Sequence, residues 1–297
     1  LKDPFVELAK GSMNTFLNAM TYPDKTMYPI GSCNDADFRN LMDVYLDAVF
    51  YPNIYKEEKI FKQEGWHYHL ENAEDPIVYN GVVYNEMKGA FSTPEDVLQR
   101  NVFNSLFPDT PYGAESGGDP GVIPDLSYEE FLDFHRRYYH PSNSFIYLYG
   151  NLDMKERLDY LDREYLSAFD KITVESEIPY QKPFAETAEC RLTYPILNEE
   201  SEKEKTFLSW SVVVGDILDV TKSIAFSILE YVLLSSPGAP VKQALLDAGI
   251  GKDIEGSYED GILQPFFSIV AKQAEETDRD RFLQVIRETL AKLSEEG

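Results

Sequence analysis

A strand–helix pattern that occurs twice constrains the fold of this chain more than any other feature. An apolar run at residues 144–150 is followed by a charged amphipathic helix up to residue 169, and the run at 265–271 is followed by a second such helix. The runs have strand length, and the later segments have the 3–4-residue apolar spacing of helices. This similarity suggests two copies of one α+β unit, although strand–helix pairs are common in proteins.

Other segments support a mixed α+β fold. A helix is predicted from Asn34 or Asp35 to the helix-breaking Pro52, since apolar side chains recur there every three or four residues. Ser127 and Glu130 form a capping box that starts another helix. Residues 206–214 read as a strand and residues 222–235 as a strongly apolar helix.

Residues 170–190 are polar, contain two prolines and lack a helical stripe, which is typical of a linker. We therefore predict a first domain at 1–170, a linker at 171–190 and a second domain at 191–297. A length of 297 residues fits about two domains. The chain has no initiator methionine and opens on Leu1. We expect it to be part of a longer protein, with the second domain incomplete.

The charge of the chain limits its partners. There are 52 acidic and 27 basic residues, and the formal net charge is −25. Nucleic-acid binding needs a basic face, so we expect no nucleic-acid partner. An acidic surface attracts cationic ligands, and it also simply keeps a protein soluble. No apolar run approaches the ~20 residues of a membrane span, so no membrane partner is expected.

Cysteine usage points to a reducing compartment. Cys33 and Cys190 are the only cysteines and are far apart in sequence, so they do not make a disulfide framework. No signal or transit peptide is recognisable. We expect a bacterial cytoplasm, or an organelle matrix if the source is a eukaryote.

Glu86 is the candidate for chemistry. It lies in a predicted helical segment beside Val82, Val83 and Met87, which predicts partial burial of its carboxylate. A buried carboxylate must be ion-paired, protonated or bound to a metal. Physical chemistry alone favours an Arg or Lys partner over a metal and leaves both open.

The four histidines give weaker signals. His67 and His69 would share one face of a strand, which suits a metal, but no further ligand lies nearby in sequence. A structural role is the simpler interpretation. His135 and His140 lie near the end of a predicted helix, where a capping or core role is expected. Nucleophile-elbow, phosphate-loop and dinucleotide motifs are absent from the sequence.

Several ordered segments together resemble the presequence-protease branch of the pitrilysin/insulinase-type zinc metallopeptidases. The matching segments span most of residues 1–170, and residues 190–297 resemble a second family domain more loosely. These segments are residues 2–5 (Lys-Asp-Pro-Phe), 11–26, 41–50, 63–66, 81–90, 116–120 and 139–144. The resemblance implies two related αβ domains, each with a mostly antiparallel sheet packed against helices.

The resemblance also implies a zinc site. Family members take two histidines and a general-base glutamate from an H-x-x-E-H motif, and a distant glutamate completes the ligands. Glu86 matches that distant ligand. The strand that corresponds to residues 13–16 pairs with the substrate backbone in relatives, so Asn14 and Thr15 are implied substrate contacts.

This chain departs from the family pattern at one essential point. The H-x-x-E-H motif is absent, and in the family it precedes the segment that begins here at Leu1. No catalytic residue is therefore assigned within the chain, and the general-base Glu is expected upstream of Leu1. The resemblance further implies a C-terminal half that closes over the substrate.

Two functions follow from the resemblance. The leading hypothesis is part of a zinc endopeptidase that degrades short or unstructured peptides, including cationic ones, with residues 1–297 inactive alone. The alternative is a non-catalytic subunit or peptide-binding protein of the same fold. The sequence upstream of Leu1 would separate them, because only the enzyme needs an intact H-x-x-E-H.

Overall fold

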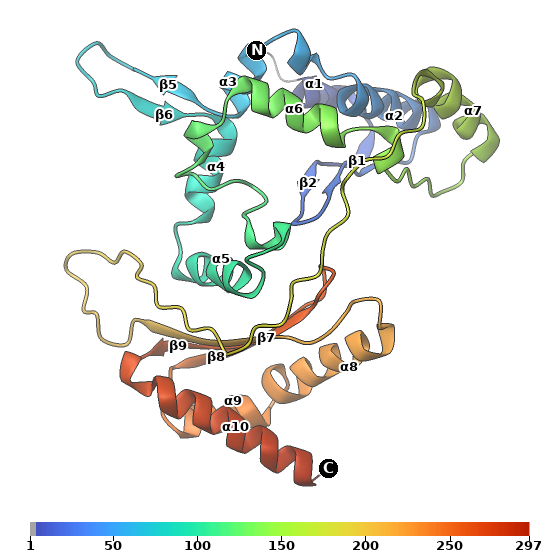
Figure 1. Cartoon of the computed structure of the whole chain (residues 1–297). Coiled ribbons are helices and arrows are strands. Elements are labelled where there is room, and N and C mark those ends of the chain that lie inside the picture. The colour runs from blue at the N-terminus through green and yellow to red at the C-terminus, as the bar shows by residue number, and fades with distance from the viewer. Residues whose placement is uncertain (1–3, 297) are drawn as a thin grey trace. The chain divides into compact units, whose positions relative to one another are not determined.

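Residues 91–115 do not pack with the segments that flank them but with the C-terminal part of the chain. The computed structural model describes residues 4–296, in two units (Figure 1). The first unit is Leu1–Ala90 with Ser116–Glu177, and the second is Phe91–Glu115 with Ile178–Gly297. Lys2 and Asp3 of the Lys-Asp-Pro-Phe segment lie outside the described residues. These packing units do not test the predicted domains at 1–170 and 191–297, which stay a prediction.

The first unit combines helices with short strand pairs. Its helices are α1 (Pro4–Gly11), α2 (Asp35–Phe50), α3 (Lys59–Glu64), α4 (Val82–Ala90), α6 (Tyr128–Tyr138) and α7 (Met154–Glu164). Its strands are β1 (Asn14–Leu17), β2 (Met20–Thr21), β3 (Thr26–Met27), β4 (Ile30–Ser32), β5 (His67–His69) and β6 (Val78–Asn80). The strands form three separate antiparallel pairs, β1 with β4, β2 with β3 and β5 with β6.

Helix α2 forms as its sequence predicts. The Asn34 side chain accepts a hydrogen bond from the Asp37 amide and caps the helix. Leu41, Met42 and Tyr45 from the predicted apolar stripe are buried. The capping box that starts α6 is also present.

Polar contacts join α2 to α7. Tyr160 and Tyr165 of the α7 region both donate hydrogen bonds to the Asp43 carboxylate on α2. These bonds stabilise the charged carboxylate and lower the pKa of Asp43. Buried Arg157 reaches Asp35 at the start of α2, with 2.5 Å between Nη2 and Oδ1.

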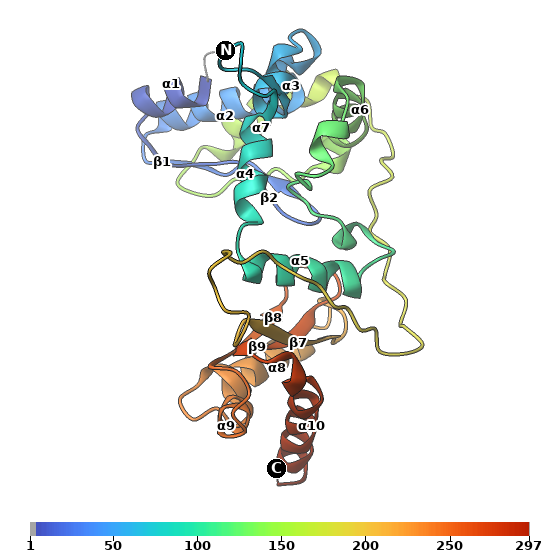
Figure 2. The same ribbon diagram turned by 90° about the vertical axis from the view of Figure 1, so that its left-hand side faces the viewer.

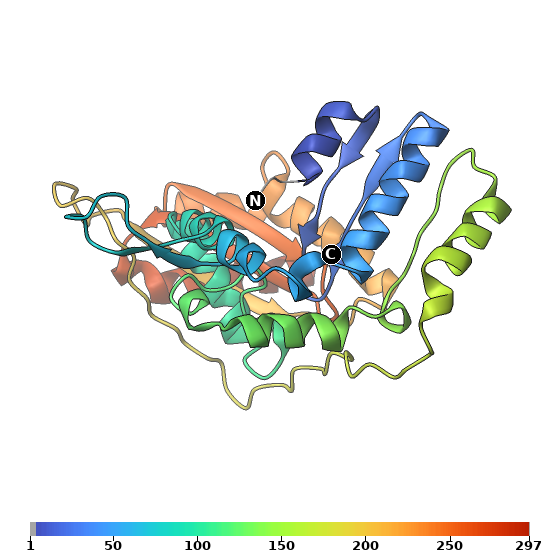
Figure 3. The ribbon, with the colours of Figure 1, turned by 90° about the horizontal axis from the view of Figure 1, so that it is seen from above.

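The predicted strand at residues 144–150 is not formed. These residues make neither helix nor strand, and Figure 3 shows them as bare chain between α6 and α7. The physical reason is the lack of a partner, because a strand is stable only when its backbone pairs with a neighbour. The described part of the chain places no strand beside this segment.

The second unit is built on one antiparallel sheet in the order β7-β9-β8. Its strands are β7 (Thr206–Val213), β8 (Asp253–Glu259) and β9 (Phe266–Ala274). Its helices are α5 (Pro94–Leu106), α8 (Val220–Glu230), α9 (Pro240–Asp247) and α10 (Arg279–Glu296). Figures 1 and 2 show α5 on one face of the sheet and α8, α9 and α10 on the other. The predictions of strands at 206–214 and 265–271 are confirmed.

Alternation along β9 explains the two faces. Phe267, Ile269 and Ala271 point into the core shared with α9 and α10. Phe266 points the opposite way and packs with Phe107 and other side chains of the α5 region. Successive side chains of a strand face opposite sides, so a strand that is apolar throughout is covered on both sides.

The predicted apolar helix at 222–235 consists of α8 and a π-helical turn, Tyr231–Ser235. Together with α9 this stretch, Val220–Asp247, is long and apolar enough by composition to cross a membrane. Pro237 and Gly238 interrupt it, however, and Val241 and Leu245 of α9 are buried in the core of the second unit. Helix α8, by contrast, has no buried residue, and only 17% of the most apolar part of this stretch is buried. The expectation that no apolar run approaches the length of a membrane span is therefore not confirmed for Val220–Asp247.

Candidate functional site

Helix α4 carries Glu86, and the backbone of Gly81 sets where this helix starts. A Cβ atom at position 81 would overlap the Gly65 carbonyl oxygen and would lie 2.8 Å from the Cα of Trp66. The Tyr84 amide donates a hydrogen bond of 3.3 Å to the same Gly65 oxygen. Only glycine permits this close approach, which ties the first turn of α4 to the end of α3. Sequence reasoning missed this role, although Gly81 stands directly before the helical segment.

Glu86 is exposed on α4, so the prediction of partial burial is wrong. The physical reason is that Val82 and Val83, expected to cover it, are themselves exposed. Met87 is the half-buried residue of this turn and lies against Gly117. Glu86 makes no ion pair with any residue from 4 to 296, so the Arg or Lys partner favoured by physical chemistry alone is not found there.

Glu86 has the chemistry of a metal ligand but belongs to no group of ligands among the described residues. An unpaired carboxylate is a good zinc ligand because it offers a negatively charged oxygen. Structural and catalytic zinc sites need at least three protein ligands. No group of three His, Cys, Asp or Glu side chains that could hold a metal occurs among the described residues.

Asn14 and Thr15 lie on β1, whose register with β4 shifts between Asn14 and Phe16. The Asn14 amide bonds to the hydroxyl of Ser12 at 3.0 Å, while the Thr15 side chain is exposed. Among the described residues β1 pairs only with β4, which leaves its second edge open. An open edge offers the unpaired N–H and C=O groups that an extended peptide requires.

The structure does not bring these candidates against one another. Helix α4 and strand β1 are apart in the view of Figure 1, although both belong to the first unit. Glu86 and the pair Asn14 and Thr15 therefore belong to one unit, and no hydrogen bond joins Glu86 to either of them in the described chain.

His67 and His69 lie on one face of β5 and have ring centroids 6.2 Å apart. His67 Nδ1 lies 2.7 Å from the Lys62 carbonyl oxygen and so donates to it. That bond fixes the ring of His67 against α3. Neither imidazole belongs to a metal-type cluster in the described chain, and the structural role of the pair stays a prediction.

The expected roles of His135 and His140 are confirmed. His140 Nδ1 accepts a hydrogen bond of 3.0 Å from the Ser142 amide, which caps the turn Pro141–Asn143. His135 is partly buried, with Nε2 donating to the Val49 carbonyl at 2.9 Å and Nδ1 accepting from the Tyr55 hydroxyl at 2.7 Å. Both bonds suit a neutral imidazole.

We expect His135 to make the first unit less stable in mild acid. Burial lowers the pKa of His135 below its usual value. The unfolded state therefore takes up a proton first as pH falls below about 6.5, so this stability is present above that pH and lost below it. Urea unfolding at pH 7.5 and 5.5 should show a smaller pH effect in His135→Gln than in the parent chain. An unchanged pH effect would contradict this role, and His69→Gln is the control.

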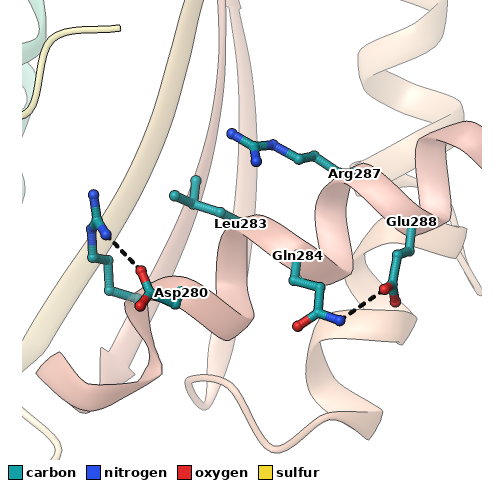
Figure 4. Close-up of a pocket in the computed structure, with 6 residues that line it drawn as sticks. Asp280, Leu283, Gln284, Arg287 and Glu288 are labelled. Carbon is teal, nitrogen blue, oxygen red and sulfur yellow. Dashed lines mark hydrogen bonds and ion pairs between the residues drawn. The ribbon is translucent and has the colours of Figure 1, made fainter.

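Neither of two surface depressions brings a set of catalytic side chains together. The first runs along α10, as Figure 4 shows. There the Gln284 side-chain amide donates a hydrogen bond of 2.8 Å to the Glu288 carboxylate, in a solvated i, i+4 pair. All its lining residues come from this one helix: Arg279, Asp280, Leu283, Gln284, Arg287 and Glu288. The second lies on the β5–β6 hairpin and is lined by Tyr68, Ile77, Val78 and Tyr79. Neither contains a nucleophile–base pair.

Comparison with known proteins defines the class. The family described as Peptidase M16 inactive domain matches residues 125–297, more than half of the chain. The chain therefore belongs to the peptidase M16 family. The matched region is the inactive type of domain in that family, which agrees with the absence of a complete metal site from the described residues.

The relatives confirm the predicted branch. The chain is 53% identical over 296 residues to protein HypA of Clostridium perfringens and covers 30% of its length. It is 44% identical over 301 residues to presequence protease 1 of Arabidopsis thaliana, a chloroplastic and mitochondrial protein, and covers 28% of its length. The chain thus spans less than a third of either relative, with all of its own residues matched.

Solved structures confirm the fold. Pitrilysin matches 98% of this chain with a TM-score of 0.60 at 18% identity, over 29% of the pitrilysin chain. A peptidase M16 inactive domain from Pseudomonas fluorescens matches 97% with a TM-score of 0.59 at 14% identity, over 63% of that chain. The predicted α+β, pitrilysin/insulinase-like fold class is correct.

Proposed function

We propose that this chain is part of a zinc-dependent endopeptidase that degrades short or unstructured peptides. Glu86 carries the proposal. It is an exposed carboxylate on an anchored helix without an ion-pair partner in the described chain, at the position that matches the distant zinc ligand of the family. Exposed carboxylates without an ion pair also occur on other helices of the described chain, such as Glu129 on α6, so the match of Glu86 to the family position is what distinguishes it.

Zinc bound at such a site polarises a scissile carbonyl and lowers the pKa of a bound water. Glu86 would supply one oxygen ligand, and the remaining ligands and the general base would come from outside residues 1–297. The anchoring of α4 at Gly65 fixes the position of the helix backbone that carries Glu86.

Substrate recognition would use the open edge of β1. Backbone pairing at an edge reads main chain more than side chains, so it suits peptides of varied sequence. Asn14 and Thr15 lie on this edge strand. The net charge of −25 favours cationic peptides, because an acidic protein raises their local concentration.

A non-catalytic peptide-binding protein is the second candidate. It is favoured by the match to an inactive type of domain over residues 125–297. Such a protein would need the open β1 edge and would not need Glu86. The two functions therefore differ in whether zinc binds.

The test compares the whole polypeptide with residues 1–297. We expect the purified whole protein to contain zinc and to cleave an unstructured cationic peptide, and a chelator to remove both properties. Residues 1–297 alone should show no turnover, since no complete ligand set occurs among the residues that the structure describes. Peptide binding without zinc in the whole protein would support the second candidate instead. Chelator-sensitive cleavage by purified 1–297 would overturn the assignment of a shared site.

Other proposals follow from the relatives. The limits 1–170 and 191–297 are proposed as evolutionary domains joined by the linker 171–190. A further domain of the same polypeptide is the proposed partner. The location is proposed as a bacterial cytoplasm or an organelle matrix, since the relatives include a bacterial protein and a chloroplastic and mitochondrial one.

A further inference from the structure

The unpaired segment at residues 144–150 has the composition of an inner strand. Residues 145–149 are apolar or aromatic without interruption, so both faces of a strand built from them would be apolar. Strands of that kind are normally covered on both sides within a sheet. Five residues is also a usual strand length.

In the first unit these side chains have no cover. Phe145, Tyr147 and Tyr149, which would share one face of a strand, are 104%, 84% and 83% exposed. On the other face Ile146 is exposed and Leu148 is half-buried. Three adjacent exposed aromatic rings are unusual on a solvated surface and mark an interaction site.

The backbone of this segment is also unpaired. No backbone hydrogen bond of residues 145–149 is found within the part of the chain that the structure describes. Both ends are nevertheless held: the turn Pro141–Asn143 leads into an extended Ser144, and Asp153 caps α7. Free N–H and C=O groups between two fixed ends form a template for strand pairing.

We propose that residues 145–149 are an inner strand of a sheet that an apolar β-strand from the same polypeptide, outside residues 1–297, completes. Backbone pairing requires an extended partner, and the apolar faces require that partner to bring hydrophobic cover. A further part of the same polypeptide can supply this partner strand, since this sequence covers only 28–30% of the length of the two relatives compared above. A second copy fits poorly because each chain carries a net charge of −25, and like charges repel.

Hydrogen exchange tests the proposal without reference to zinc or turnover, so it can fail independently of the proposed function. The amides of residues 145–149 should exchange freely in purified 1–297 and slow by about a hundredfold or more in the whole polypeptide. Equal exchange in the two proteins would overturn the proposal. So would a gene that encodes nothing outside residues 1–297.

A proline variant provides a second readout. Tyr147→Pro removes a backbone donor and should lower the melting temperature of the whole polypeptide by several degrees, with little effect on 1–297. Ala188→Pro, at an exposed residue outside the predicted strand, is the matched control and should have little effect on either protein. An equal effect of Tyr147→Pro on both proteins would count against the pairing.

Sedimentation and hydrogen exchange of 1–297 test two other possible partners of residues 145–149, a second copy of the chain and a substrate peptide. We expect a monomer with unprotected amides at 145–149. Protection that grows with protein concentration, together with dimer formation, would assign the surface to a second copy. Protection of 1–297 on addition of an unstructured peptide would assign it to substrate. Either result would overturn the proposal.

Discussion

Replacing Glu86 by Gln in the whole polypeptide is expected to abolish bound zinc and nearly all peptide cleavage. The amide keeps the size of the side chain but removes the negative oxygen that a zinc ion prefers. Turnover should fall by about a thousandfold or more, because metal catalysis contributes several kcal/mol and each ~1.4 kcal/mol is a factor of ten. Metal analysis and a peptide-cleavage assay measure the two effects.

The folded state should not change in this variant. Glu86 is exposed and makes no ion pair in the described chain, so Glu86→Gln should leave the unfolding midpoint within experimental error. Glu74→Gln, at another exposed glutamate of the first unit, controls for the loss of one charge and should retain both zinc and activity. If Glu86→Gln kept its zinc content and activity, the ligand assignment would be wrong.

Replacing Gly81 by Ala is expected to destabilise the first unit by about 2–3 kcal/mol, the cost of adding a methyl group where no space exists. The new Cβ would overlap the Gly65 carbonyl, which is backbone and cannot move aside as a flexible side chain could. Urea unfolding should show the loss. In the whole polypeptide the zinc content should also fall, since α4 would shift and carry Glu86 with it.

Gly89→Ala is the matched control because Gly89 lies in α4, the helix that Gly81 precedes. A Cβ at position 89 meets no atom within 4 Å. Alanine is the better helix former, so this variant should be neutral or more stable by roughly 0.5 kcal/mol. If both glycine variants behaved alike, the anchoring of α4 by a close backbone contact would be refuted.

Local signals predicted several helices and two of the three strands of the second unit. The Asn34 cap and the apolar stripe of α2 appear as expected, and so do the capping box of α6 and the strands β7 and β9. Such features depend on neighbours within a few residues, so they are readable from the chain alone. Strand β8 was missed, because Asp253–Glu259 is polar and alternates weakly.

The environment of the candidate residue was not predicted correctly. Family resemblance implies that Glu86 is the distant zinc ligand, which stays a prediction, whereas its helical neighbours suggested burial and the structure exposes it. Burial depends on what packs against a helix, and that partner comes from elsewhere in the chain. For the same reason the packing of residues 91–115 with the second unit could not be foreseen.

Residue patterns indicated an acidic α+β protein, and the resemblance carried by ordered segments indicated the peptidase family, with Glu86 as the metal ligand that it predicts. The tertiary structure alone decided how Gly81 anchors the Glu86 helix, and that residues 144–150 remain without a partner strand. The physical reason is the separation in sequence over which each kind of interaction acts. Caps and apolar periodicity act between neighbouring residues, whereas strand pairing and close backbone contact depend on segments that the sequence places far apart.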